Sequence, residues 1–210
     1  MDDKDRHPHV VCLFCFILSP MKKDPWLEKW LPLISEKAMG GYVLELGCGN
    51  GRDTVDLLSA GCRVIAADLS MENLRECDTA VPQASLLQLD NGKTLPFANS
   101  SIAVIVASLS LHYFSWDVTM QISSELSRCF KPGGVLIARF NSTNDVNYGA
   151  SSGLEIEPNF YQVRNSTKRF FDENSVRFFL QRWDIQFLEE NIIDRYDKPK
   201  SVWEVMAVCI

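Results

Sequence analysis

The sequence lacks an excess of positive charge. Its 27 Asp and Glu residues outnumber its 21 Lys and Arg residues, which gives a net charge of −6. Proteins that hold nucleic acid by its phosphate backbone need clustered Lys and Arg side chains. We therefore expect no nucleic-acid partner.

A long apolar run is also missing. Val10–Leu18 is apolar throughout, but a helix needs about 20 such residues to span a bilayer. The preceding residues are mostly acidic, whereas a signal peptide begins with positive charge. We expect a cytoplasmic protein with no membrane contact.

Clusters of Cys and His with metal-ligand spacing are absent. The seven cysteines are odd in number and scattered, which favours buried free thiols in a reducing compartment. Cys12 and Cys15 form a C-x-x-C pair, but no second pair accompanies it, so we expect no metal site.

The length of 210 residues suits one domain. Residues 1–20 are expected to be an extension, non-native or disordered, because Met21 would make a natural start. The domain is then residues 21–210. Asp24 followed by Pro25 predicts a capped helix that Pro32 interrupts. Within it, Trp30 is expected to pack on a sheet.

A glycine-rich turn follows the first predicted strand. Val43–Thr54 reads VLELGCGNGRDT, which predicts a strand, a tight turn with glycine at alternate positions, and a helix that begins at Arg52. Such a turn lets a ligand lie against the main chain, and a helix N-terminus favours negative charge. The dinucleotide-binding fingerprint G-x-G-x-x-G does not match, whether it is started at Gly47 or at Gly49.

Carboxylates end the next two predicted strands. Arg63–Ala67 stops at Asp68, and Ser85–Leu89 stops at Asp90. An acidic residue about 20 positions after a glycine turn is placed to bind a ribose diol. The alternatives are a helix N-cap at Asp68, for which Ser70 is the better candidate, and a simple turn at Asp90.

These stretches together resemble the class I S-adenosylmethionine-dependent methyltransferases. Glu45–Gly51 resembles their motif I, and Asp68, Asp90, Ile102–Ser108 and Lys131–Gly134 follow in the family's order. The resemblance implies an α/β fold: a Rossmann-like, seven-stranded, mostly parallel sheet with helices on both faces and a C-terminal antiparallel hairpin. Lys131–Gly134 is expected to be only a turn.

The resemblance also implies a site for S-adenosylmethionine. Asp68 would bind the ribose, and Asp90 would meet the adenine. The residues implied to bind the cofactor are Glu45, Gly47, Cys48, Gly49, Asn50, Gly51, Asp68, Leu69, Asp90, Asn91 and Ser108.

The acceptor is expected to be a small molecule. Family members that methylate nucleobases or protein glutamine carry Asn/Asp-Pro-Pro-Tyr/Phe after the central strand, whereas this chain continues into His112 and Tyr113. These two are the catalytic candidates, with His112 as a hypothetical general base or a structural residue. The chain looks most like the small tellurite-resistance and thiopurine type, through Gly47–Arg52 and Phe170–Asp172. Methyl transfer would be an in-line displacement on O, N, S or a heavier chalcogen.

In the segment from Asn141 to Lys168, apolar residues do not recur at the regular spacing of a helix or a strand. We expect a long loop there that caps the substrate. Asp184–Glu189 and Ser201–Ile210 are predicted to form the closing hairpin.

Two other functions stay open. The first is a partner-dependent protein methyltransferase, and the second is an inactive, methyltransferase-like binding module. Whichever function holds, we expect a monomer or homodimer. The inactive module predicts gaps in the cofactor motifs, and the sequence shows none.

Deletion of residues 1–20 tests the predicted extension. We expect the shortened protein to bind S-adenosylmethionine as the full chain does, measured by calorimetry. A shortened protein that folds and no longer binds would contradict the expectation.

Overall fold

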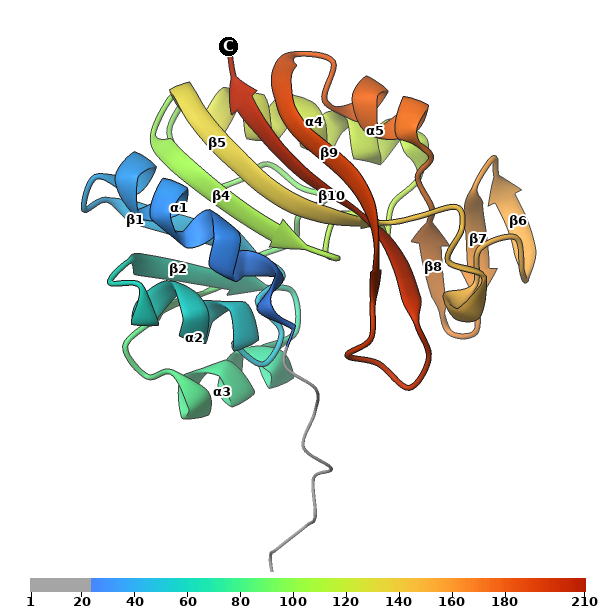
Figure 1. The fold of residues 1–210 in the computed structure, drawn as a ribbon, viewed down its shortest axis with the longest axis horizontal. Helices are drawn as coiled ribbons and strands as arrows, with labels where there is room; N and C mark the ends of the chain where they lie inside the picture. The colour runs from blue at the N-terminus through green and yellow to red at the C-terminus, as the bar shows by residue number, and fades with distance from the viewer. Residues whose placement is uncertain (1–23) are drawn as a thin grey trace, which may run out of the picture.

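The computed structural model describes residues 24–210. The predicted extension at residues 1–20, with Met21, Cys12 and Cys15, lies outside the described residues. The described chain forms a seven-stranded sheet in the order β3-β2-β1-β4-β5-β10-β9 (Figure 1). Its strands are β1 (Tyr42–Leu46), β2 (Arg63–Asp68), β3 (Ser85–Gln88), β4 (Ile102–Ser108), β5 (Phe130–Asn141), β9 (Trp183–Ile193) and β10 (Lys200–Cys209).

The predicted fold class is confirmed. Strands β1 to β5 pair in parallel, and β10 pairs antiparallel with both β5 and β9. The closing hairpin therefore forms as predicted. The predicted turn Lys131–Gly134 is wrong, because these residues lie within β5, at a register shift against β4.

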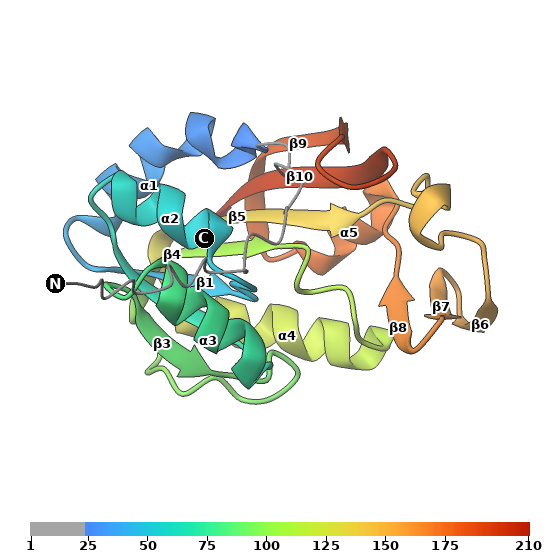
Figure 2. The same ribbon diagram turned by 90° about the horizontal axis from the view of Figure 1, so that it is seen from below.

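Helices cover both faces of the sheet. One face carries η1 (Pro25–Trp30), α1 (Leu31–Ala38), α2 (Arg52–Ser59) and α3 (Met71–Ala80). The other carries α4 (Trp116–Cys129) and α5 (Glu173–Phe179). Figures 1 and 2 show α4 on the opposite side of the strands from α1 and α2.

Strand β4 shows why the sheet is buried on both faces. Val104 and Val106 pack under α1 to α3, while Ile105 and Ala107 pack under α4 and α5. Because successive side chains point to opposite faces, a continuous apolar run fills two cores at once. The run that predicted this strand therefore places it at the centre of the sheet.

The predicted loop after β5 is wrong. It contains a short 3₁₀ helix, η2 (Val146–Tyr148), and a three-stranded antiparallel sheet of β6 (Leu154–Glu157), β7 (Phe160–Val163) and β8 (Ser166–Arg169). We call β6 to β8 the cap sheet. Each strand has four residues, and much of it is exposed. Such short strands contain too few buried apolar residues to give the alternating apolar and polar pattern by which a strand is predicted from sequence.

The N-terminal segment also differs from expectation. The side chain of Asp24 makes no cap hydrogen bond to η1. Pro32 does not interrupt the helix, because it lies in the first turn of α1, where its missing N–H is not needed. Trp30 packs edge-on against Phe187 and donates to Glu204 Oε1 at 2.7 Å, so its predicted place on the sheet is confirmed.

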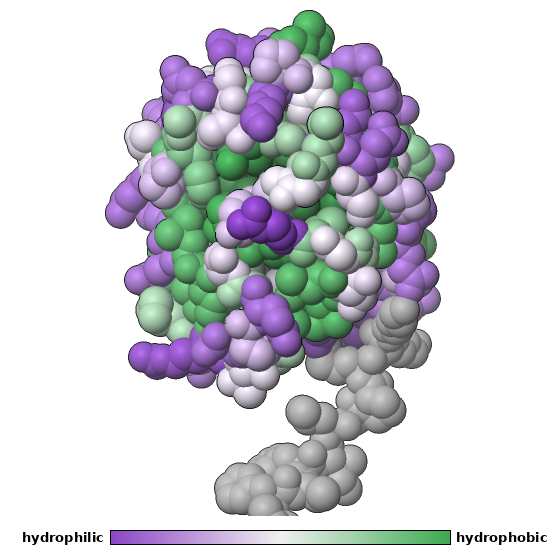
Figure 3. Space-filling view, turned by 90° about the vertical axis from the view of Figure 1, so that its left-hand side faces the viewer, coloured by the Kyte–Doolittle hydropathy of each residue, from purple (hydrophilic) through white to green (hydrophobic). Residues whose placement is uncertain are grey.

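The end of the molecule away from the cap sheet has a mixed surface. Figure 3 shows apolar and polar residues interspersed over this end. No described helix is both long and apolar enough to cross a membrane. Of the described cysteines, all are free, and Cys48, Cys62, Cys77 and Cys129 are buried.

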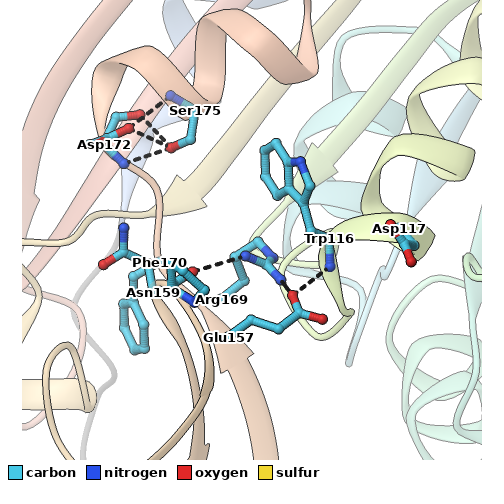
Figure 4. Close-up of a pocket in the computed structure, with 9 residues that line it drawn as sticks. Trp116, Asp117, Glu157, Asn159, Arg169, Phe170, Asp172 and Ser175 are labelled. Atoms are coloured by element: carbon cyan, nitrogen blue, oxygen red, sulfur yellow. Dashed lines mark hydrogen bonds and ion pairs between the residues drawn. The ribbon is translucent and has the colours of Figure 1, made fainter.

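One guanidinium fastens the cap sheet to the core. Arg169 lies between the rings of Trp116 and Phe160 and pairs with Glu157. The Glu157 carboxylate also accepts from the backbone N–H of Trp116 at 2.8 Å. Figure 4 shows this junction, which lines a cavity of about 410 Å³ with Asp172 at its far side. The ion pair joins β6 to β8, and the hydrogen bond from the Trp116 N–H holds both strands against the start of α4.

Glu157→Gln tests this clamp. The amide keeps an acceptor for Trp116 but loses its charge toward Arg169, and a partly exposed ion pair contributes about 1 kcal/mol. We expect roughly fivefold faster amide hydrogen exchange in residues 154–169. Glu189→Gln, an exposed change on β9, is the control. Unchanged exchange in the cap sheet would show that the ion pair does not hold it.

Candidate active site

The three glycines of the loop after β1 are required for different reasons. All have positive φ. A Cβ on Gly47 would lie 2.2 Å from Ser110 Cβ, and one on Gly51 would lie 2.8 Å from Cys77 Sγ. A Cβ on Gly49 would meet nothing within 4 Å. Two glycines are therefore needed by the protein's own packing, and Gly49 alone leaves open space for a ligand.

Asp68 holds this loop from the end of β2. Its Oδ2 accepts from the backbone N–H of Gly49 at 2.9 Å. Its Oδ1 accepts from the N–H of Ser70 at 2.8 Å and from Asn73 Nδ2 at 3.2 Å. Ser70 caps α3 by accepting from the N–H of Asn73, as predicted. Asp68 thus supports the loop and is still partly exposed beside it.

A cavity of about 250 Å³ lies against the loop. Five of the predicted cofactor residues line it: Gly47, Cys48, Gly49, Asn50 and Ser108. Four lining residues were missed by the sequence analysis: Arg52, Asp53, Arg195 and Tyr196. The last two belong to the β9–β10 connection, about 150 residues away in the chain, and no local motif marks them.

Glu45 lies beneath the loop instead of lining the cavity. Its side chain is buried, and Oε2 accepts from Thr54 Oγ1 at 2.6 Å. Burial, opposed by the Thr54 hydrogen bond, raises the pKa of Glu45 to about 8. The group therefore joins β1 to α2, in a largely protonated state near neutral pH.

The remaining predicted cofactor residues lie outside the lining of this cavity, and Asn91 lines a different one. Leu69 is 64% exposed, and Gly51 is buried against α3. Asp90 accepts from the N–H of Gly92 at 2.9 Å and is 3.5 Å from Lys93 Nζ. Asn91 is next to it and partly exposed. The structure places none of these in the lining of the 250 Å³ cavity.

A buried arginine connects three elements at this edge. Arg139 of β5 is fully buried, and its Nε and Nη2 donate to Ser108 Oγ at 3.0 and 2.8 Å. Its Nη1 donates to Asp24 at 2.6 Å, and its guanidinium lies 4.2 Å from the ring of Trp26. Arg195 approaches the same Asp24 oxygen at 3.4 Å. Asp24, predicted as a helix cap, is thus shared by two arginines.

The two catalytic candidates lie together beyond β4. Their rings are 4.3 Å apart, with His112 buried and Tyr113 45% exposed. Burial, with Lys200 and Lys168 nearby, lowers the pKa of His112 well below its usual value. His112 Nδ1 has no hydrogen-bond partner. His112 is therefore neutral, and its protonated form is strongly disfavoured.

Glu45→Gln tests the buried carboxyl. The folded pKa of about 8 lies above the ordinary 4.5, so the folded state holds a proton that the unfolded chain releases. The stability from this group is complete below about pH 4.5 and is lost as the pH rises through about 8. We expect the melting temperature of Glu45→Gln to depend less on pH between about 5 and 8 than that of the wild type. Glu36→Gln, exposed on α1, should keep the wild-type slope; equal slopes for all three proteins would contradict the assignment.

Known proteins resemble this chain in both sequence and fold. Residues 43–134 match the family model described as a methyltransferase domain. An uncharacterized methyltransferase of Synechocystis sp. is 34% identical over 96 residues, which cover 46% of this chain and 45% of that protein. The chain spans less than half the length of the curated relatives it matches.

Solved structures extend the likeness to the whole described fold. An S-adenosylmethionine-dependent methyltransferase from Methanosarcina mazei superposes with a TM-score of 0.73 at 20% identity, over 85% of this chain and 97% of that one. TehB from Haemophilus influenzae gives 0.61 at 14% identity, over 90% of this chain and 68% of that one. Residues 43–134 therefore match a methyltransferase domain, and the described chain has the fold of S-adenosylmethionine-dependent methyltransferases.

Proposed function

We propose that this protein transfers a methyl group from S-adenosylmethionine to a small-molecule nucleophile. The observation that carries the proposal is the open position at Gly49, which faces a cavity while its neighbouring glycines are filled by the protein itself. Gly61 also has open space at its Cβ position, so the opening at Gly49 counts because Gly49 lines the 250 Å³ cavity together with Gly47 and Ser108.

The residues around the cavity suit the parts of this cofactor. Asp68, at the end of β2, would accept from the ribose hydroxyls, and Asp90 with Asn91 would meet the adenine. Arg195 Nε is buried without a hydrogen-bond acceptor, and a carboxylate is the acceptor that a guanidinium prefers. Arg195 would thus bind the amino-acid end of the cofactor.

The cofactor supplies a methyl group on a positively charged sulfur. We propose that a lone pair of the acceptor attacks this methyl group in line, with alignment contributing up to ~7–11 kcal/mol. A general base must gain a proton, and the lowered pKa of His112 makes it a poor one. We therefore propose that His112 and Tyr113 contact the acceptor and do not remove a proton from it.

Enclosure favours a small acceptor. The cap sheet lies against the exit of β4, since Arg169 N–H donates to the His112 carbonyl at 2.7 Å and Thr167 Oγ1 donates to the Tyr113 carbonyl at 3.0 Å. A partner-dependent protein methyltransferase needs an open channel at this position. The tellurite-resistance and thiopurine type remains part of the proposal, as do a cytoplasmic location and a monomer or homodimer.

Calorimetric titration with S-adenosylmethionine tests the function through Gly49→Ala. Alanine at this positive φ costs about 1–2 kcal/mol of strain and places a methyl group in the opening. Gly61→Ala is the matched control, because Gly61 also has positive φ and open space around it. We expect saturable binding by the wild type and by Gly61→Ala, and a loss of at least about tenfold in Gly49→Ala.

Asp68→Ala should also weaken binding, whereas Asp78→Ala, an exposed change on α3, should not. A folded wild-type protein that binds no S-adenosylmethionine would reject the proposed function and favour the inactive module.

A further inference from the structure

Three polar side chains at one edge of the sheet have buried atoms that make no hydrogen bond, although the Arg195 guanidinium also faces Asp24 and donates to Tyr196. Among the described residues, the buried side-chain atoms without a hydrogen bond are His112 Nδ1, both polar atoms of Asn141, and Arg195 Nε. A buried donor or acceptor left unpaired loses its hydrogen bonds to water without a replacement, and native proteins leave few such groups. All three residues follow the carboxyl ends of strands, where an α/β sheet binds its ligands.

His112 and Asn141 belong to one location. The His112 carbonyl accepts from the N–H of Arg169 at 2.7 Å, and the Asn141 carbonyl accepts from the N–H of Phe171 at 2.7 Å. Arg169 and Phe171 are two positions apart in an extended stretch, a separation of roughly 7 Å. The backbones of these two residues are therefore close together, although the residues are 29 positions apart in sequence.

A chain of ring contacts joins this location to the cofactor cavity. Tyr196 lines the cavity and lies 5.6 Å from the ring of Tyr148. Lys200 Nζ lies 4.8 Å from the ring of Tyr148. Lys200 in turn acts electrostatically on His112. Through Lys200 and Tyr148, His112 is thus linked to Tyr196 in the lining of the cavity.

Positive charge exceeds negative charge at this location. Lys200 is buried and pairs with Asp145 Oδ2 at 2.6 Å. Burial and the nearby Arg164 lower the pKa of Lys168, whereas Asp145 raises it. Lys200 and Lys168 thus both lie near the Asp145 carboxylate. Lys168 is half-buried, and within residues 24–210 no hydrogen bond or ion pair is found for its ammonium group.

We propose that the methyl acceptor is an oxyanion, bound by Lys168, His112 and Asn141 beside the cofactor cavity. This rests on the proposed function and names its substrate class. Lys168 supplies the charge. The Asn141 amide and the neutral His112 supply hydrogen bonds that the protein leaves unmade. Carboxylates and phosphates share the required chemistry.

An anionic acceptor also agrees with the lowered pKa of His112, which makes this residue a poor general base. The acceptor oxygen forms a bond to the methyl carbon, the carbon–sulfur bond breaks, and its electron pair returns to sulfur. The negative charge on oxygen and the positive charge on sulfur cancel, so no proton has to be removed.

The test follows the NMR resonance of the His112 ring while ligands are titrated. The chain has three histidines, and the other two are His7 and His9, so the ring resonance of His112 in protein labelled at histidine Cε1 is assigned by comparison with His112→Gln. Full-length protein is first saturated with S-adenosylhomocysteine, and saturation is verified by calorimetry. Benzoate, acetate and inorganic phosphate are then titrated, with benzamide and acetamide as the neutral counterparts.

We expect at least one anion to shift the His112 resonance saturably, about tenfold more tightly than its amide. Lys168→Gln should remove this preference, and Lys131→Gln, an exposed lysine at the start of β5, should retain it. Benzoate and phosphate serve to distinguish a carboxylate acceptor from a phosphate.

Asn141→Leu separates ligand binding from a structural role. The leucine removes two unpaired buried polar atoms, so the melting temperature should stay the same or rise while anion binding weakens. A fall in melting temperature with unchanged anion binding would show that Asn141 has a structural role, and would contradict its proposed role in binding the anion.

The outcomes separate the two proposals. Failure to bind S-adenosylhomocysteine would reject the proposed function. Saturation with it, followed by no anion preference or by an equal preference in Lys168→Gln, would reject the anionic acceptor and leave the proposed function standing.

Discussion

The buried guanidinium of Arg139 is the interaction on which the carboxyl edge of the sheet depends. It extends from β5, contacts Ser108 at the end of β4, and pairs with Asp24 ahead of η1. Trp26 lies against it and donates to Asp53 of α2 at 3.1 Å. A buried charge must be paired and fully hydrogen-bonded, and loss of one partner costs about 3–5 kcal/mol. The N-terminal segment is therefore fixed over the cavity by electrostatics as well as by packing.

The same edge divides into two halves of different chemistry. Carboxylates follow β2 and β3, at Asp68 and Asp90, where a ribose and an adenine offer hydrogen-bond donors. Cations lie in the other half: Arg139 is in β5, Lys168 is in β8 and Arg195 follows β9. Tyr113 lies after β4, and burial with Tyr196 and Asp68 nearby raises its pKa. A cofactor that is donor-rich at one end and an acceptor that is anionic at the other fit this division.

The cap sheet lies between β5 and α5 in the chain. Like β9 and β10 of the main sheet, strands β6 to β8 lie outside residues 43–134, which match the methyltransferase domain model. Their attachment depends on Arg169, whose side chain pairs with Glu157 and whose backbone N–H binds His112. One residue thus connects the cap to the groups that we assign to the acceptor.

The sequence by itself determined the scaffold, because local signals carry it. The apolar run of β4, the turn glycines and the Ser70 cap each act within a few residues, and each predicted its element correctly. Only the tertiary structure decided which residues share the site. Gly47 proved to be required by Ser110 and Glu45 to be buried under Thr54, while Arg139, Arg195 and Lys168 reached the cavity edge from distant elements. Such pairings depend on the register and packing of strands far apart in the chain, and no local period encodes them.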